Sequence, residues 1–128
     1  MTGGFVRTVG GDLAVDALGA TNYHEHFFQV SPLLPGDELV DETASTEEAR
    51  SLRASGFAAV VDATPHGLGR RPDALARLSR AARLTVVATA GRHRDDHYRD
   101  QPHVLEDCLG VGRALHARAA RGDARRRS

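Results

Sequence analysis

The hydrophobic residues of the chain fall into short runs separated by polar turns. Residues 57–63 form a nearly continuous apolar run, which is typical of a strand buried on both faces by flanking helices. Residues 84–90 repeat this pattern before a polar, histidine-containing loop. Residues 20–28 favour a shorter strand that runs into a loop, which a Pro-Gly-Asp turn at residues 35–37 closes. Three strands are therefore predicted.

Helical signals lie between these strands. Ser45 and Glu48 have the spacing of a capping box, which predicts a helix from Thr46 to about Ser55 with Gly56 just beyond its end. A second helix is predicted from residue 72, because a proline there suits the first helical turn. The residues that follow it place one apolar stripe between arginines.

The order of these elements predicts the fold class. Strand, helix, strand, helix, strand is the repeat of an α/β protein with a parallel sheet or a β/α barrel. Around residues 10–12, short apolar stretches and two glycines predict an N-terminal hairpin within residues 5–19. A complete TIM barrel needs ~250 residues, so we expect a partial (β/α) TIM-type barrel with its first three or so strands.

The charge of the chain changes abruptly near its end. Residues 1–107 hold 11 Arg against 16 acidic residues, whereas residues 108–128 hold 6 Arg against 1 acidic residue. Residues 105–128 are therefore expected to be a weakly helical to disordered tail rich in Arg and Ala. The swing in net charge from −5 to +5 also suggests a frameshift or truncation near residue 110.

Composition argues against several classes of protein. The single cysteine, Cys108, has no internal disulfide partner, and residues 1–20 lack the features of a secretory signal, so a cytoplasmic protein is expected. The apolar runs are far shorter than the ~20 residues of a membrane helix, so no membrane association is expected. Because the Arg-rich end lacks interleaved aromatic residues, no nucleic-acid binding is expected either.

His24 and His26 are the strongest candidates for chemistry. They fall at the end of the first predicted parallel strand, where residues two apart project to the same face and Glu25 points away. Two such imidazoles suit Zn²⁺ and related metals. An isolated His-x-His pair is more often solvated, but the ends of β/α-barrel strands are where functional groups gather.

Four other residues are weighed with them. Asp62 either supports a metal-bound imidazole from behind or caps the turn that follows its strand. His66 lies in a loop that also ends a strand, where contact with a substrate and solvation are equally expected. His93 and His97 lie in a charged loop, for which solvation is the favoured interpretation.

The sequence around the histidine pair, Asn22 to Phe27, resembles the first barrel strand of the phosphotriesterase family in the amidohydrolase superfamily. Residues 60–70, Val-Val-Asp-Ala-Thr-Pro-His-Gly-Leu-Gly-Arg, resemble its second strand and loop. The similarity covers about residues 5–100 and implies that residues 1–104 are the N-terminal part of such a barrel. The resemblance further implies a binuclear zinc centre with His24 and His26 as two of its ligands.

In that family the remaining ligands lie on later strands: a carboxylated lysine or a glutamate, two further histidines and an aspartate. This chain contains no lysine, and those positions fall beyond it. The resemblance implies hydrolysis of a small-molecule ester, either a phosphotriester, a lactone or a related ester, by a metal-bound hydroxide. His66 and His93 are then expected to bind substrate, and no catalytic residue is assigned.

Two interpretations of the function remain open. In the first, the chain is a truncated, inactive fragment of a zinc-dependent hydrolase, because its metal centre is incomplete. In the second, it is a non-enzymatic remnant or interaction module that assembles through open sheet edges.

Overall fold

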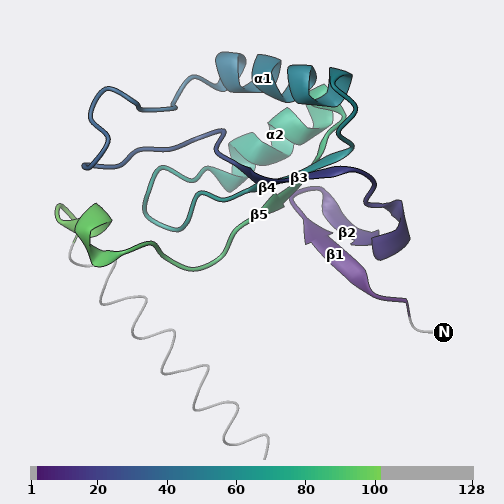
Figure 1. Ribbon diagram of the computed structural model, residues 1–128, viewed down its shortest axis with the longest axis horizontal. Helices are drawn as coiled ribbons and strands as arrows, with labels where there is room; N and C mark the ends of the chain where they lie inside the picture. The colour runs from purple at the N-terminus through teal and green to yellow at the C-terminus, as the bar shows by residue number, and fades with distance from the viewer. Residues whose placement is uncertain (1–2, 102–128) are drawn as a thin grey trace, which may run out of the picture.

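The computed structural model describes residues 3–101, which form two small sheets and two helices (Figure 1). An antiparallel hairpin of β1 (Phe5–Thr8) and β2 (Gly11–Ala14) comes first. A parallel sheet follows with the strand order β3 (Thr21–Glu25), β4 (Ala59–Asp62), β5 (Thr85–Ala88). The helices α1 (Glu42–Ala54) and α2 (Pro72–Ala82) connect its strands, and short 3-10 helices occur at η1 (Val15–Ala17) and η2 (Asp95–Tyr98).

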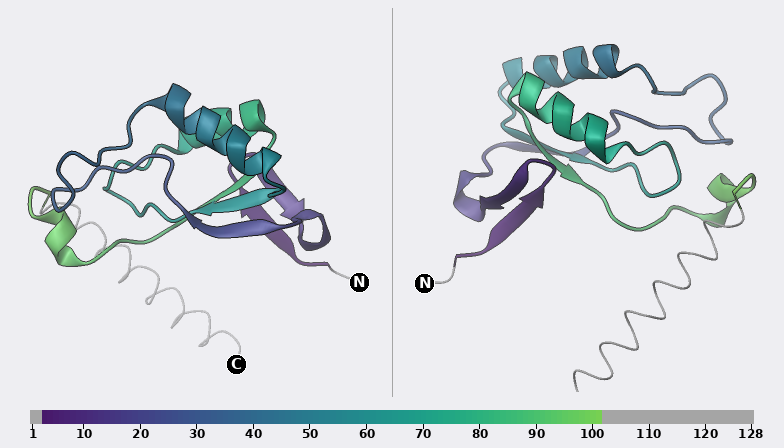
Figure 2. Two further views of the ribbon diagram at one scale, coloured as in Figure 1. Left: turned by 45° about the horizontal axis from the view of Figure 1, so that its top comes forward. Right: turned by 180° about the vertical axis from the view of Figure 1, so that it is seen from behind.

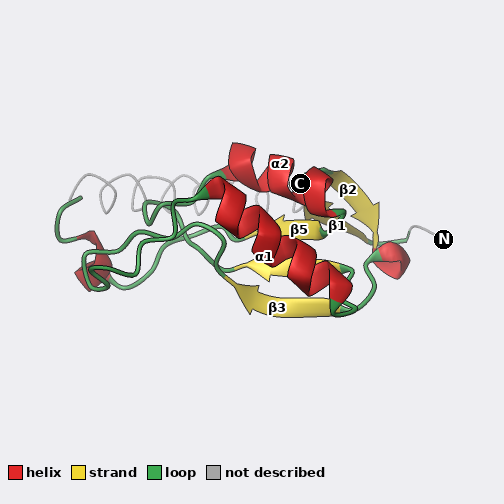
Figure 3. Ribbon diagram, turned by 90° about the horizontal axis from the view of Figure 1, so that it is seen from above, coloured by secondary structure: helices red, strands yellow, loops and turns green. Residues whose placement is uncertain are grey.

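Both α helices cover the same face of the parallel sheet (Figure 3). The core between the two layers is built from Val60 and Val86 of the sheet and from Leu75 and Leu78 of α2, all of which are buried. This packing buries one face of the strands. The expectation that flanking helices bury both faces is wrong for the described residues, because Val61 and Val87 on the opposite face are only partly buried. The predicted parallel β-α-β units and the hairpin are confirmed, whereas the three parallel strands of the described residues do not close into a barrel.

The start of α1 differs from the sequence-based prediction. The helix begins at Glu42, and its N-cap is Asp41, whose carboxylate accepts the Ala44 N–H at 3.1 Å. The predicted Ser45 capping box is therefore wrong. The Ser45 hydroxyl instead donates to the Phe27 carbonyl at 2.6 Å and so joins α1 to the segment after β3. The predicted end of the helix is confirmed, because Ser55 is its C-cap and Gly56 follows with a φ of 105°.

The second helix begins at Pro72, as predicted, and ends in a conformation that its sequence does not signal. Its C-cap, Arg83, has a φ of 53°, in the left-handed region that non-glycine residues seldom occupy. This turn leads directly into β5. The strands β4 and β5 are shorter than the apolar runs at 57–63 and 84–90 that predict them, because residues at both ends of each run lie outside the strand.

The loops after the three parallel strands extend together from one end of the sheet, as both views in Figure 2 show. Backbone hydrogen bonds join them: the Val30 N–H donates to the Leu68 carbonyl at 2.8 Å, and the His66 N–H donates to the Gly91 carbonyl at 3.0 Å. The predicted tail at 105–128, including Cys108, lies outside the described residues. Within residues 3–101, no helix has the length and apolar character needed to cross a membrane.

Candidate metal site and adjoining pocket

The two histidines after Tyr23 lie against each other at the carboxyl end of the sheet. His24 belongs to β3, His26 follows it directly, and their Nε2 atoms are 3.1 Å apart. The rings meet edge to face, with centroids 5.0 Å apart. The expectation that both imidazoles share one side is therefore confirmed. Their role as metal ligands stays a prediction.

The spacing of the two Nε2 atoms fits one metal ion. At the ~2.0–2.1 Å zinc–nitrogen distance of protein sites, two ligands at a tetrahedral angle are separated by roughly 3.3 Å. The observed 3.1 Å is close to that value. When no metal is bound, the same contact requires one ring to donate a hydrogen to the other, since each neutral imidazole carries a single N–H.

The surroundings of His26 favour its neutral form. Burial is the main cause that lowers the pKa of His26 below its ordinary value; His24 acts in the same direction and Asp62 opposes it. Its Nδ1 atom lies 2.9 Å from the hydroxyl oxygen of Thr64. A neutral imidazole keeps one nitrogen lone pair available, which metal binding requires.

Asp62 performs one of the two roles expected for it. One oxygen of its buried carboxylate accepts the Thr64 N–H at 2.9 Å, and the other accepts the Phe27 N–H at 3.0 Å. It therefore caps the turn after β4 and also holds the chain that leaves β3. The side chain that contacts Nδ1 of His26 is Thr64 and not Asp62, so Thr64 is the residue that sequence analysis missed.

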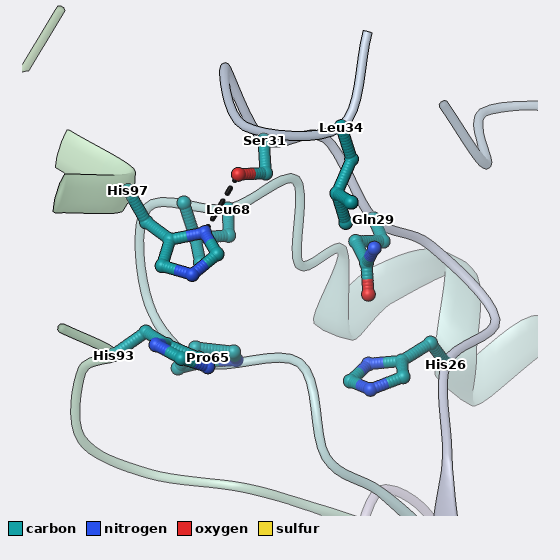
Figure 4. A pocket seen from close by; sticks show the side chains of 8 residues that line it. All are labelled: His26, Gln29, Ser31, Leu34, Pro65, Leu68, His93 and His97. Carbon is teal, nitrogen blue, oxygen red and sulfur yellow. Dashed lines mark hydrogen bonds between the residues drawn. The ribbon is translucent and has the colours of Figure 1, made fainter. Parts of the chain in front are cut away.

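A pocket of about 320 Å³ opens beside His26, between the loops that follow the three strands (Figure 4). None of the side chains around it is a carboxylate, an ammonium or a guanidinium group. Its lining residues are His26, Gln29, Ser31, Leu34, Pro65, Leu68, His93 and His97. The arrangement suits a small, uncharged ligand with some apolar surface.

His97 is buried in this pocket wall, so the expectation that it is solvated is wrong. Only 8% of its surface is exposed, and its Nδ1 atom lies 2.7 Å from the Ser31 hydroxyl. Burial is the first cause that lowers the pKa of His97, and the nearby His93 and Arg94 lower it further. This contact joins the loop after β5 to the loop after β3.

Tyr98 fixes the same loop from its other side. Its buried hydroxyl donates to the His66 carbonyl at 2.8 Å and accepts the His93 N–H at 2.9 Å. The His93 ring itself stays exposed and packs 4.0 Å, centroid to centroid, from the ring of His97. Hydrogen bonds among the three loops therefore define the pocket wall.

Comparison with known proteins identifies the family of the chain. The sequence model of the phosphotriesterase family matches residues 4–105. The chain belongs to the phosphotriesterase family. A "phosphotriesterase homology protein" of Mycobacterium tuberculosis is 32% identical over 117 residues, which cover 86% of this chain and 35% of that protein. The chain thus spans about a third of the length of the curated relatives it matches.

Solved structures of phosphotriesterase-family proteins share its fold. A lactonase from Listeria monocytogenes has a TM-score of 0.63 and 32% identity, covering 69% of this chain and 28% of its own. An organophosphorus hydrolase from Deinococcus radiodurans has a TM-score of 0.59 and 37% identity, covering 71% and 30%. The described residues therefore correspond to one part of such structures.

Members of this family typically depend on a binuclear metal centre. Between residues 3 and 101, no group of three or more His, Cys, Asp or Glu side chains is arranged to hold a metal. Of the two histidines expected to contact substrate, His93 lines the pocket beside His26. His66 is exposed and is not among the pocket residues. Both assignments stay predictions.

Proposed function

We propose that this chain carries the first metal-binding element of a zinc-dependent hydrolase that acts on phosphotriesters, lactones or related esters. In this proposal His24 and His26 both coordinate one zinc ion through Nε2 at the carboxyl end of β3. The single observation that carries the proposal is the 3.1 Å separation of these two atoms, on a chain whose family relatives include a lactonase and an organophosphorus hydrolase.

The pocket beside His26 accommodates the ester in this proposal. Its lining, which contains no carboxylate, ammonium or guanidinium group, matches a neutral ester or lactone, and His93 contacts the substrate from the wall opposite His26 (Figure 4). Zinc held by His24 and His26 would supply polarisation of the ester oxygen and activation of water. The protein residues orient the ester and keep His26 neutral.

The described residues supply only two ligands to this centre, whereas a catalytic zinc site takes three protein ligands and a water molecule. We therefore expect the 128-residue chain to bind zinc weakly and to hydrolyse neither phosphotriesters nor lactones. Turnover would require other segments that supply the missing metal ligands.

The test measures zinc content and turnover together for the purified chain and for the double variant His24→Ala, His26→Ala. Weak zinc binding that the double variant loses, without hydrolysis of a phosphotriester or a γ-lactone, is the expected result. Stoichiometric zinc with hydrolysis that the double variant abolishes would show that the chain is an enzyme by itself. Zinc binding that survives in the double variant would contradict the assignment of the ligands.

A second function, an interaction module, is favoured by the edge of β3. Among the described residues, β3 pairs only with β4, and Tyr23 on this strand is 83% exposed. An uncovered edge strand offers backbone hydrogen bonds to another chain. In this alternative the chain associates through β3 and catalyses nothing.

A further inference from the structure

The hydroxyl of Thr64 has a place in the site that the family assignment does not give it. We propose that Thr64 is a positioning residue that makes His26 competent to bind a metal. Its hydroxyl oxygen accepts a hydrogen bond from Nδ1–H, which leaves the lone pair of Nε2 free to coordinate the ion. The inference rests on the proposed function, because it concerns the same metal ligand.

Thr64 is held in place independently of His26. It is 1% exposed, and its backbone N–H donates to Asp62, whose carboxylate also accepts the Phe27 N–H next to His26. One carboxylate therefore fixes both the segment that carries the hydroxyl and the segment that carries the imidazole. The 2.9 Å contact between Thr64 Oγ1 and His26 Nδ1 follows from this rigid support.

The tautomer of His26 decides whether it can bind a metal. A neutral imidazole has one hydrogen, so donation from Nε2 to an ion requires that hydrogen to lie on Nδ1. Thr64 Oγ1 is the group that Nδ1 contacts in the described part of the chain. An Nδ1–H without an acceptor in this partly buried position would lose its hydrogen bond and destabilise the metal-binding tautomer.

A hydroxyl suits this position better than either a carboxylate or an apolar group. It both donates and accepts, so it bonds Nδ1 whether or not that nitrogen carries the hydrogen. In the metal-free protein, the contact between the Nε2 atoms of His24 and His26 also needs one hydrogen. Rotation of the Thr64 hydroxyl lets His26 move its hydrogen to Nδ1 when a metal arrives, without exposing an unpaired polar atom.

The experiment uses the full chain with ¹⁵N-labelled histidine. Nuclear magnetic resonance reports which ring nitrogen of His26 carries hydrogen, before and during titration with Zn²⁺. The variants are Thr64→Val, which is isosteric but lacks the hydroxyl, and Thr64→Ser, which restores it. The matched control is Thr89→Val, because the Thr89 hydroxyl donates to the Asp62 carbonyl at 2.6 Å in the same region and does not contact His26.

We expect Thr64→Val to change the tautomer populations of His26 in the metal-free chain and to weaken zinc binding roughly 10- to 100-fold, as loss of such a partner does. Thr64→Ser should restore both properties, and Thr89→Val should leave both unchanged. A metal-free tautomer signal that is the same in wild type and Thr64→Val overturns the inference. If that signal changes but no variant or wild type binds zinc through histidine, the proposed function fails while the role of Thr64 in setting the tautomer stands.

Discussion

The histidines within residues 3–101 differ mainly in what surrounds them. His24 and His26 face each other, His97 is enclosed by the pocket wall, and His66 faces solvent. Because an enclosed imidazole is costly to charge, the buried ring of His97 makes the stability of the fold depend on pH. The same residue type thus serves different purposes at different positions.

The folded chain should lose stability as pH falls below about 6.5, the ordinary pKa of histidine. The pKa of His97 is lowered in the folded state, so the unfolded chain takes up a proton first. The stability that depends on neutral His97 is fully present above pH 6.5 and is lost as pH falls through the folded-state pKa of His97. In urea unfolding at pH ~7.5 and ~5, His97→Gln should show a smaller loss than wild type. Equal losses would contradict this assignment.

Gly69 is a second residue whose surroundings decide its identity. Its φ is +84°, and a Cβ atom at this position would lie 2.7 Å from the backbone nitrogen of Val30. That nitrogen donates to the Leu68 carbonyl, which holds the loop after β4 against the loop after β3. A side chain at residue 69 would therefore strain the backbone and also separate two walls of the pocket.

Gly69→Ala should lower the free energy of unfolding by at least the roughly 1–3 kcal/mol expected for a strained backbone conformation, as measured by urea denaturation. The matched control is Gly56→Ala, where φ is +105° but no atom lies within 4 Å of the added Cβ. Its loss should be smaller, because only the backbone conformation is disfavoured. A loss at Gly56 as large as that at Gly69 would show that the close contact is relieved at no cost.

At the scale of elements, α1 illustrates how a helix start is chosen between two acceptable caps. Asp41 and Ser45 both have side chains that cap helices. The acidic residue lies nearer the N-terminus and places its charge where the helix dipole favours it. Ser45 lies within the helix, where its hydroxyl bonds the Phe27 carbonyl. Asp41 therefore stabilises the start of the helix, whereas Ser45 attaches the helix to the segment that follows β3.

Asp41→Ala should destabilise the chain by about 1 kcal/mol, the usual effect of losing an N-cap, with a reduced helical signal in circular dichroism. Asp41→Asn is the matched control, because its amide oxygen still accepts the Ala44 N–H, and it should retain most of the stability. If Ala and Asn prove equally destabilising, the charge of Asp41 matters and its hydrogen bond does not.

At the scale of the whole molecule, the two edges of the parallel sheet differ. The hairpin reaches the edge of β5, where the Val9 N–H donates to the Val86 carbonyl at 2.9 Å. The edge of β3 has no strand beside it within residues 3–101. Association between chains is therefore expected through β3, if it occurs through the sheet.

Sedimentation velocity over a range of concentrations should reveal reversible self-association of the purified chain. Tyr23→Lys should weaken it, because a charged residue on an edge strand opposes pairing with another chain. Val40→Lys is the control: Val40 is 59% exposed but precedes α1 and belongs to no strand. Association that both variants reduce equally would indicate a general apolar contact rather than strand pairing.

The sequence by itself determined the features that depend on neighbouring residues. The proline at residue 72 sets the start of α2 through the local geometry of one turn. Apolar runs predict β4 and β5 because the strands of parallel sheets are rich in apolar residues. The alternation of a strand places His24 and His26 on one side, and the similarity around them indicates the family. Each of the structural signals lies in a short, continuous stretch of sequence next to the feature that it predicts.

Only the tertiary structure decided the contacts between distant segments. Thr64 reaches His26 across 38 positions of the chain, and Ser31 reaches His97 across 66. No local pattern marks either pair, because the sheet brings the ends of its strands together irrespective of their distance in sequence. The burial of His97 and the support of His26 both follow from that convergence. The physical reason is that a hydrogen bond depends on distance in space, whereas sequence patterns report only the geometry of adjacent residues.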